Sequence, residues 1–241
     1  FNGTSNYILS TMEKENKSFD EVLYNAKKLG YAESNPIADL NGADVSSKLK
    51  ILASLCFNSF INNKIFVEGI NEIDKFDIDN ANKLGYKIKL LGFAEVLNNK
   101  IYQRVHPSLI KKKSYVASID GVLNAVIIEG RPVGQSIIQG EGAGPAATTS
   151  ALISDISSIM RGNIKFPFSL STKERKNLKF EKIQDRSFSA YFRFDVLDKP
   201  GVLSNITNVF SKNKTSIKRL IQNTNKNKKI SSIIIITHLT K

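Results

Sequence analysis

The chain of 241 residues is long enough for one large domain or two small ones, and its 41% hydrophobic and 24% charged residues are ordinary for a globular protein. No apolar run approaches the roughly 20 residues of a membrane-spanning helix and no signal peptide is visible, so we expect no membrane partner and a cytoplasmic location. The single cysteine, Cys56, excludes an intramolecular disulfide and a cysteine-rich zinc site. Because it lies in an apolar run, we predict a core position for it.

The net charge of +13 raises the hypothesis of a nucleic-acid partner. The basic residues are mostly lysines scattered among Asn and Ile, which is typical of biased composition. The two clusters, Lys111–Lys113 and Lys226–Lys229, lack interleaved aromatic residues for base stacking and lie where loops are expected. We therefore expect no nucleic-acid partner, and we keep a basic nucleic-acid-binding protein only as a hypothesis that a salt titration would test.

The first 60 residues predict three helices. The first carries Ile8, Leu9 and Met12 on one face, and the second follows Ser18, an N-cap with Glu21 three residues on. The apolar face of the second helix comprises Val22, Leu23, Ala26 and Leu29, and Gly30 ends it. The third helix runs from about Ala43 to Phe60, with Val45, Leu49, Leu52, Ala53 and Cys56 on one side.

From Lys64 the pattern changes to short β-branched segments bounded by Gly, Asn or Pro, which is typical of strands. The predicted strands are KIFVEGI, YKIKLLGFAEVL, KIYQRVHP, SYVASI and NAVIIEG, with a short helix, DIDNANKLG, after the first. A further strand, VGQSIIQGEG, leads into a helix that begins near Pro145 and ends before Gly162. The stripe of that helix comprises Leu152, Ile153, Ile156, Ile159 and Met160. This order predicts the α+β class, with a mixed sheet covered by helices on one face.

Residues 163–187 lose periodicity and gain charge, so we place a linker at 166–188 between a first domain, 1–165, and a second domain, 189–241. The second domain alternates through Tyr191, Phe192, Phe194 and Val196, turns at Asp198–Gly201 and continues as a helix. Strands are then expected from Ile217 and from Ile230 to Thr237. This order describes most of a small ferredoxin-like βαββ(αβ) module that the end of the chain truncates.

The stretch from Gly30 to Lys48 gathers three carboxylates and a lysine. Asp44 and Lys48 are four residues apart and share a helix face, so a surface ion pair worth a few tenths of a kcal/mol is one interpretation. That interpretation leaves Glu33 and Asp39 unexplained. Carboxylates near the start of a helix can accept the N–H donors of an ammonium group, and a lysine beside them can hold a proton at an oxygen that changes charge. The alternative is therefore an amino-acid site.

This stretch resembles the signature of the homoserine dehydrogenase family. The restricted positions of that signature are occupied here by Ala26, Gly30, Tyr31, Ala32, Asn35, Pro36, Asp39, Leu40, Gly42, Asp44 and Lys48. The resemblance implies NAD- or NADP-dependent interconversion of homoserine and aspartate 4-semialdehyde. It implies that Glu33 and Asp44 bind the ammonium end of the amino acid and that Lys48 donates the proton. It also implies that Asp39 supports the lysine and that Tyr31 lines the pocket.

Two further segments are similar to parts of the same family. FNGTSNYIL resembles its Asn-Gly-Thr segment, which implies that Gly3 and Thr4 lie near the substrate. GEGAGPAATTSAL resembles the return of the family's chain to its cofactor, which makes Gly142 and Ala143 candidate cofactor contacts. From the residues alone, this second segment is equally a tight strand-to-helix turn or an anion site at a helix N-terminus. We assign no metal ligands, and neither His106 nor His238 receives a catalytic role.

The DKPGVLSNITNVF turn resembles an ACT domain, an amino-acid-sensing module. The resemblance implies an allosteric site at Asp198, Pro200 and Gly201 with threonine as effector, and the family implies a homo-oligomer. We expect the 241 residues alone to be inactive because the family's nucleotide-binding half and its other active-site lysine precede this region. The rival interpretation is a non-catalytic amino-acid-binding regulator, which would not need to keep Glu33, Asp44 and Lys48.

Overall fold

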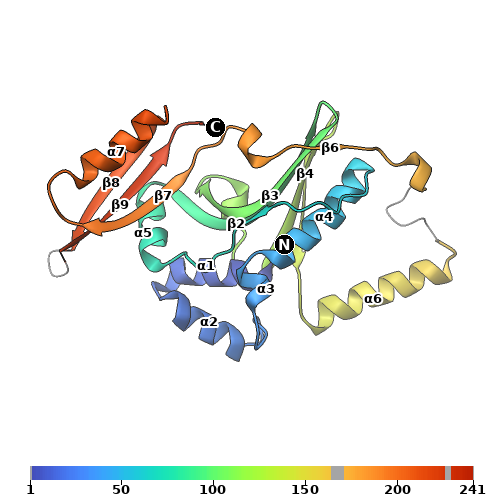
Figure 1. Ribbon diagram of the computed structural model, residues 1–241. Helices are drawn as coiled ribbons and strands as arrows, with labels where there is room; N and C mark the ends of the chain where they lie inside the picture. The colour runs from blue at the N-terminus through green and yellow to red at the C-terminus, as the bar shows by residue number, and fades with distance from the viewer. Residues whose placement is uncertain (1, 164–170, 226–228, 241) are drawn as a thin grey trace. The chain divides into compact units, whose positions relative to one another are not determined.

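The computed structural model describes residues 2–163, 171–225 and 229–240. The chain forms two compact units, residues 1–181 and 182–241 (Figure 1). The predicted domain limits of 1–165, 166–188 and 189–241 remain predictions, and residues 166–170 of the predicted linker lie outside the described residues. The lysine cluster predicted at 226–229 also falls largely outside them.

Four helices open the first unit: α1 (Gly3–Glu15), α2 (Phe19–Lys28), α3 (Ile37–Leu40) and α4 (Ala43–Phe57). The predicted capping box of α2 is confirmed, because the Ser18 side chain accepts the Glu21 N–H while the Glu21 carboxylate accepts the Ser18 N–H. Gly30 follows α2 with φ of +77°, a left-handed conformation that favours glycine. α4 ends at Phe57 rather than Phe60, because Asn58 also adopts the left-handed conformation.

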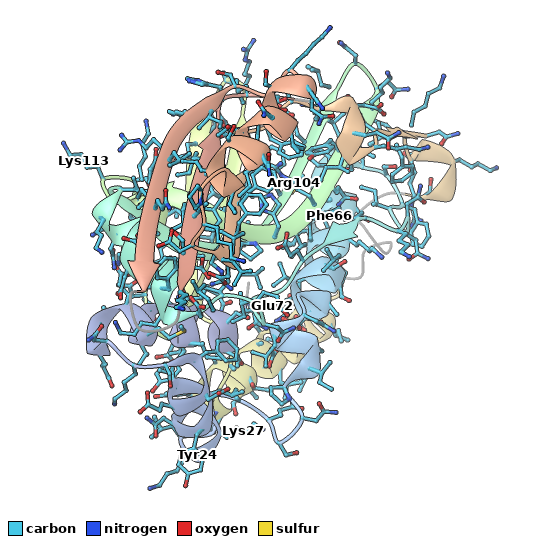
Figure 2. All side chains as sticks on the ribbon, turned by 60° about the vertical axis from the view of Figure 1, so that its left-hand side comes forward. Tyr24, Lys27, Phe66, Glu72, Arg104 and Lys113 are labelled. Atoms are coloured by element: carbon cyan, nitrogen blue, oxygen red, sulfur yellow. The ribbon has the colours of Figure 1, made fainter. Side chains whose placement is uncertain are left out.

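The main sheet of the first unit is mixed. It contains β1 (Phe66–Val67), β2 (Tyr86–Leu97), β3 (Lys100–Lys111) and β6 (Lys179–Phe180), with β1 and β6 parallel to β3 and β2 antiparallel to it. Asn98 and Asn99 join β2 to β3 and both have positive φ, as a two-residue hairpin turn that matches the strand twist requires. Phe66 on β1 lies opposite Arg104 on β3, and both are labelled in Figure 2.

Helices cover one face of this sheet. Every second residue of β2 from Ile88 to Gly92 points toward that face. Ile88 packs in a cluster with residues of α1 and α5 (Lys75–Lys83). Leu90 contacts this cluster and also the cluster that contains Val45 and Leu49 of α4. A Cβ on Gly92 would lie 3.1 Å from Val45 Cγ1, so the glycine allows α4 to approach the strand closely. The predicted α+β class, with a mixed sheet covered on one face, is confirmed.

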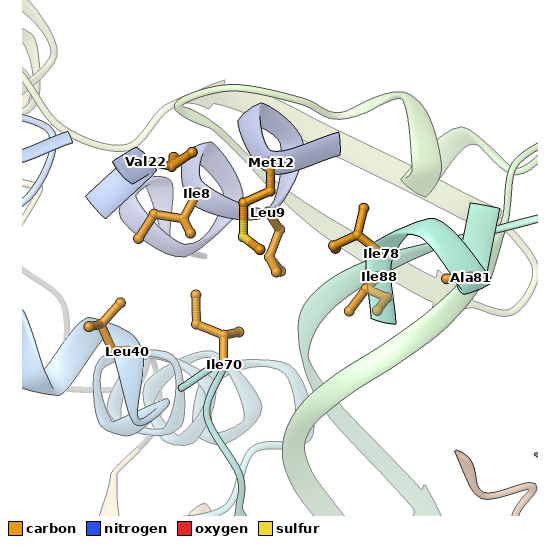
Figure 3. Packing of buried hydrophobic residues seen from close by; sticks show 9 residues of the cluster. All are labelled: Ile8, Leu9, Met12, Val22, Leu40, Ile70, Ile78, Ala81 and Ile88. Atoms are coloured by element: carbon orange, nitrogen blue, oxygen red, sulfur yellow. The ribbon is translucent and has the colours of Figure 1, made fainter. Parts of the chain in front are cut away.

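The largest core cluster joins the four-stranded sheet to the N-terminal helices (Figure 3). The apolar face predicted for α1 lies at its centre, since Ile8, Leu9 and Met12 are at most 1% exposed. Burying such side chains contributes about 1.5–3 kcal/mol each. The remaining members shown are Val22, Leu40, Ile70, Ile78, Ala81 and Ile88. This cluster holds α3, which carries Asp39, against α1.

Three local predictions are wrong. The segment SYVASI is not a strand but a 3₁₀ turn, η1 (Tyr115–Ser118), closed by the bond from the Ala117 N–H to the Ser114 carbonyl. Cys56 is exposed rather than in the core, because the buried face of α4 follows the four-residue spacing of Val45, Leu49 and Ala53. Leu29 is also exposed, because α2 ends there.

The last part of the first unit is a hairpin followed by a long helix. β4 (Leu123–Gly130) pairs antiparallel with β5 (Gly134–Glu141) in a separate two-stranded sheet. α6 (Pro145–Met160) begins with the proline at its first turn as predicted, and Gly162 follows it with φ of +74°. None of its side chains is buried, so its apolar stripe is exposed.

The second unit has the predicted β-α-β-β order: β7 (Tyr191–Leu197), α7 (Val202–Lys212), β8 (Ile217–Asn225) and β9 (Ile230–Thr237). The strands are antiparallel in the order β7-β9-β8, so the last strand lies in the middle. Phe210 of α7 packs on Ile233 and Ile235 of β9, which buries one face of the sheet beneath the helix. The near-continuous isoleucines of β9 suit this central position.

Candidate active site

The beginning of α4 carries the acidic residue and the lysine that the sequence placed on one helix face. Asp44 lies in the first turn and accepts a hydrogen bond from Lys48 Nζ at 2.8 Å on its Oδ2. Gly42 precedes the helix with φ of +84°, and a Cβ there would lie 3.0 Å from Val67 Cγ1 and 3.3 Å from the Glu68 carbonyl. The glycine therefore lets α4 begin directly against β1.

Asp39 joins this pair through a residue that the sequence did not single out. Asn2 Nδ2 donates to Asp39 Oδ1 at 2.6 Å and to Asp44 Oδ2 at 2.9 Å. The side chain of Asn2 is 7% exposed and also caps α1, because its Oδ1 accepts the Ser5 N–H at 2.7 Å. The available signal was an Asn before a helical stripe, which is typical of an N-cap but does not indicate two distant carboxylates.

The first turn of α1 also holds the loop that contains Tyr31. Thr4 Oγ1 donates to the Tyr31 carbonyl at 2.7 Å, and the ring of Tyr31 lies 4.9 Å from that of Tyr7. Ser5 Oγ donates to the Asp39 carbonyl at 2.9 Å. Thr4, Tyr31 and Asp39 are thus brought together at one end of α1.

Glu33 is not joined to this group. Its side chain is exposed, and within the described part of the chain no hydrogen bond or ion pair links its carboxylate to Asp39, Asp44 or Lys48. The structure therefore does not bring Glu33 together with the other three predicted residues.

The glycine-rich turn approaches the start of α1 through one asparagine. A Cβ on Gly142 would lie 2.0 Å from Asn124 Nδ2, and a Cβ on Gly3 would lie 3.7 Å from the same atom and 3.1 Å from the Val122 carbonyl. Asn124, on β4, therefore lies between the residue predicted near the substrate and the one predicted near the cofactor. Ala143 is exposed in the turn that follows.

A buried network of charges fixes the entry to β4. Lys89 Nζ donates to Asn6 Oδ1, the Ile119 carbonyl and Asp120 Oδ1 at 2.9, 2.6 and 2.8 Å. Burial lowers the pKa of Lys89. Burial alone would raise the pKa of Asp120, but hydrogen bonds from Lys89 and Lys87 hold it well below its usual range. Because Asn6 also donates to Ile119 and Leu123 carbonyls, α1 and β4 are tied together.

A cavity in the first unit does not coincide with the acidic group. It has a volume of about 310 Å³ and is lined mostly by apolar residues of α4, β2 and β4, with Asn2, Asn6, Lys89 and Asn124 as its polar lining. Asp39, Asp44 and Lys48 do not line it. The acidic group offers carboxylates and an ammonium group to a polar ligand, whereas the cavity offers mainly hydrocarbon.

A family model for homoserine dehydrogenase matches residues 1–157, which is more than half of the chain. The chain belongs to the homoserine dehydrogenase family. A homoserine dehydrogenase from Helicobacter pylori is 40% identical over 241 residues, and one from Synechocystis is 37% identical over 248. The alignments cover 99% and 98% of this chain but 56% and 57% of those relatives, so the chain spans about half the length of the curated relatives it matches.

Solved homoserine dehydrogenases share the fold. The enzyme from Thiobacillus denitrificans superposes with a TM-score of 0.87 at 35% identity, covering 99% of this chain and 56% of that one. A structure from S. aureus gives a TM-score of 0.72 at 33% identity, with coverage of 100% and 59%. An archaeal homoserine dehydrogenase mutant, solved in complex with NADPH, gives 0.55 at 29% identity, covering 70% of this chain and 47% of that one.

The second unit matches an ACT domain of the kind found in small subunits of AHAS, over residues 192–238. Asp198, Pro200 and Gly201 form the exposed turn between β7 and α7, and Gly201 has φ of +88°. The turn is held to the β8–β9 connection because the Asp198 N–H donates to the Lys229 carbonyl at 2.9 Å.

The other features that the sequence raised have plain positions. His106 lies within β3, which continues past it to Lys111, and burial lowers the pKa of its imidazole. In the described ranges, no group of three or more His, Cys, Asp or Glu side chains is placed to hold a metal ion. None of the helices described has the length and hydropathy to cross a bilayer.

Proposed function

We propose that the protein carrying this chain interconverts L-homoserine and L-aspartate 4-semialdehyde with NAD or NADP, and that this chain supplies the substrate site and a regulatory module. The observation that carries the proposal is the run of hydrogen bonds from Asp39 through Asn2 to Asp44 and on to Lys48. Such a run places two carboxylates and an ammonium group within reach of one small ligand. Family membership supports the same reaction.

The residue roles follow from this geometry and stay proposals. Asp44 is half-buried and Glu33 is exposed, so both can accept N–H donors from the ammonium group of homoserine. Lys48 donates a proton to the substrate oxygen when the aldehyde is reduced, and it takes the hydroxyl proton back when the alcohol is oxidised, because the reverse step retraces the same path. Asp39 supports this arrangement through the shared amide, and Tyr31, Gly3 and Thr4 shape the pocket.

The glycine-rich turn before α6 is the proposed contact with a nicotinamide cofactor. A Cβ at Gly142 would collide with Asn124, so only a glycine allows the backbone to pack this closely against that side chain. The exposed turn then leads into the N-terminus of α6, where N–H groups favour an anion. The first turn of α6 contains no acidic residue that would repel an anion. We propose that Gly142 and Ala143 contact the nicotinamide cofactor, which would supply a hydride to the aldehyde in its reduced form and accept one from homoserine in its oxidised form.

For the second unit we propose allosteric control. The turn of Asp198, Pro200 and Gly201 leads into α7, whose N-terminus has no side-chain cap, so N–H groups of its first turn could bind a ligand carboxylate. The matching ACT domain supports an amino-acid effector, which we propose is threonine. A homo-oligomeric enzyme in the cytoplasm is proposed with it. The rival, a non-catalytic regulator, is not favoured, because the acidic group and lysine are all present.

The test is homoserine-dependent reduction of NADP and of NAD by the full-length protein that contains this chain. We expect activity with at least one cofactor and inhibition by millimolar threonine, with none from the 241-residue chain alone. A folded full-length protein that reduces neither cofactor while still binding an amino acid would refute the enzyme and favour the regulator. Activity of the 241 residues alone would refute the division of labour proposed here.

A further inference from the structure

Asn2 has every hydrogen-bonding group of its side chain in use. Its Oδ1 accepts the Ser5 N–H, and its Nδ2 donates one hydrogen to Asp39 and the other to Asp44. The reverse orientation of the amide would direct an oxygen at two carboxylates and a nitrogen at an N–H donor. The network therefore determines which atom is nitrogen.

The two carboxylates that share this amide are 5 residues apart in sequence and come from different helices. Asp39 lies in the four-residue α3 and Asp44 in the first turn of α4. Two neighbouring carboxylates repel each other, and a donor placed between them offsets that repulsion by bonding to both charged forms. Since Asp44 in turn accepts from Lys48, two hydrogen bonds connect the asparagine to the lysine.

We propose that Asn2 is a positioning residue for the reaction: it holds Asp39 and Asp44 at a fixed separation and, through Asp44, holds Lys48 in its productive orientation. It does not touch the reacting atoms. This inference rests on the proposed function, because the reaction that it serves is the one proposed for Lys48. It also explains why a helix cap that any Ser, Thr or Asp could provide is an Asn here.

Capping and positioning can be separated by the choice of side chain. Asn2→Ser and Asn2→Asp both retain an oxygen that caps α1, so the thermal midpoint should change little if capping is the only role. Neither retains an N–H₂ donor. Asn2→Asp also adds a third carboxylate beside Asp39 and Asp44, so three like charges would repel one another there.

The experiment measures kcat, KM for homoserine and their pH dependence in the full-length protein, with Ser18→Ala as the control. Ser18 caps α2 through the same kind of side-chain bond, away from the acidic group. For Asn2→Ser we expect kcat to fall by about 10²-fold, the effect of misplacing a reacting group by about 1 Å, with little change in thermal midpoint. For Asn2→Asp the acidic limb of the pH profile should move to higher pH. Ser18→Ala should lose stability and keep its kcat and pH profile.

Two outcomes distinguish the inference from the function on which it rests. The first outcome is an active wild type and an inactive Lys48→Ala, with both Asn2 variants keeping kcat within threefold and an unchanged pH profile. This outcome would refute the positioning role and leave Asn2 only as the cap of α1. If the wild type is itself inactive, the proposed function fails first. Binding of homoserine by calorimetry then tests Asn2 independently: unchanged affinity in Asn2→Ser would overturn the inference as well.

Discussion

Replacing Lys48 by Ala separates the two interpretations of its contact with Asp44. As an ion pair, the contact is partly solvated, since the side chains of Lys48 and Asp44 are 47% and 27% exposed. Exposed pairs at this helical spacing contribute about 0.3–0.5 kcal/mol. For a chain of this size, that corresponds to a fall of about 1–2 °C in the thermal midpoint. The stability effect should therefore be close to the limit of measurement.

As a proton donor, the same lysine should contribute far more to the rate. A general acid typically contributes about 10²–10⁴-fold, and at about 1.36 kcal/mol per tenfold this corresponds to about 2.7–5.4 kcal/mol of transition-state stabilisation. The assay is steady-state reduction of NADP and NAD with homoserine, beside a thermal melt of the same samples. We expect kcat to fall by at least 10²-fold in Lys48→Ala while the melt moves by no more than about 2 °C.

Lys75 provides a matched control on α5. Its Nζ lies 2.8 Å from Asp79 Oδ2 with the same four-residue spacing, and the two side chains are 39% and 41% exposed. Lys75→Ala should reproduce the small change in stability without a change in kcat. Equal kcat for Lys48→Ala and wild type, or equal losses in the two variants, would show that Lys48 is only an ion-pair partner.

Two further predictions concern the surroundings of the site. Gly142→Ala places a methyl group 2.0 Å from Asn124 Nδ2, so we expect KM for the nicotinamide cofactor to rise at least tenfold. The control is Gly140→Ala, whose methyl group meets nothing within 4 Å and should leave the kinetics unchanged. Equal kinetics for both variants would contradict a closely packed turn at Gly142. Asp120→Asn leaves the buried Lys89 ammonium without its carboxylate and should cost about 3–5 kcal/mol in urea unfolding at pH 7. Because the pKa of Asp120 is depressed in the folded state, its carboxylate stabilises the folded protein above about pH 4, and this contribution is lost as the pH falls further. Asp120→Asn should therefore lose less stability in acid than the wild type does. An unchanged acid dependence of the unfolding free energy would refute this.

Interactions between residues close in sequence were predictable from the sequence. Helix geometry alone sets the distance between groups within four residues, as in the capping box of Ser18 and Glu21 and the ion pair of Asp44 and Lys48. The proline at the start of α6 follows from an equally local preference. The limits of β2, Tyr86–Leu97, match the predicted strand because alternation and the following Asn pair are equally local. Family resemblance then supplied roles that spacing did not.

Short apolar segments were less predictable, because their structure depends on what packs against them. SYVASI has the composition of a strand but lies where the chain turns to reach β4, so it forms a 3₁₀ turn whose buried residue is Ala117. Cys56 belongs to an apolar run, yet α4 has only one buried side and the cysteine lies off it. The apolar character of a residue did not determine whether its side of the helix or turn packs against the rest of the protein.

The assembly of the site was decided only by the tertiary structure. Asn2 is 37 and 42 residues from the two carboxylates to which it donates, and Asn124 reaches Gly3 and Gly142 from a separate sheet. Periodicity and capping rules extend over a few residues, whereas these contacts exist because the buried face of α1 packs against α3 and the main sheet. The sequence alone determined most of the helices and strands and, apart from Asn2, the chemical groups of the candidate site. Hydrophobic packing of α1 decided that Asn2, Asp39, Asp44 and Lys48 meet.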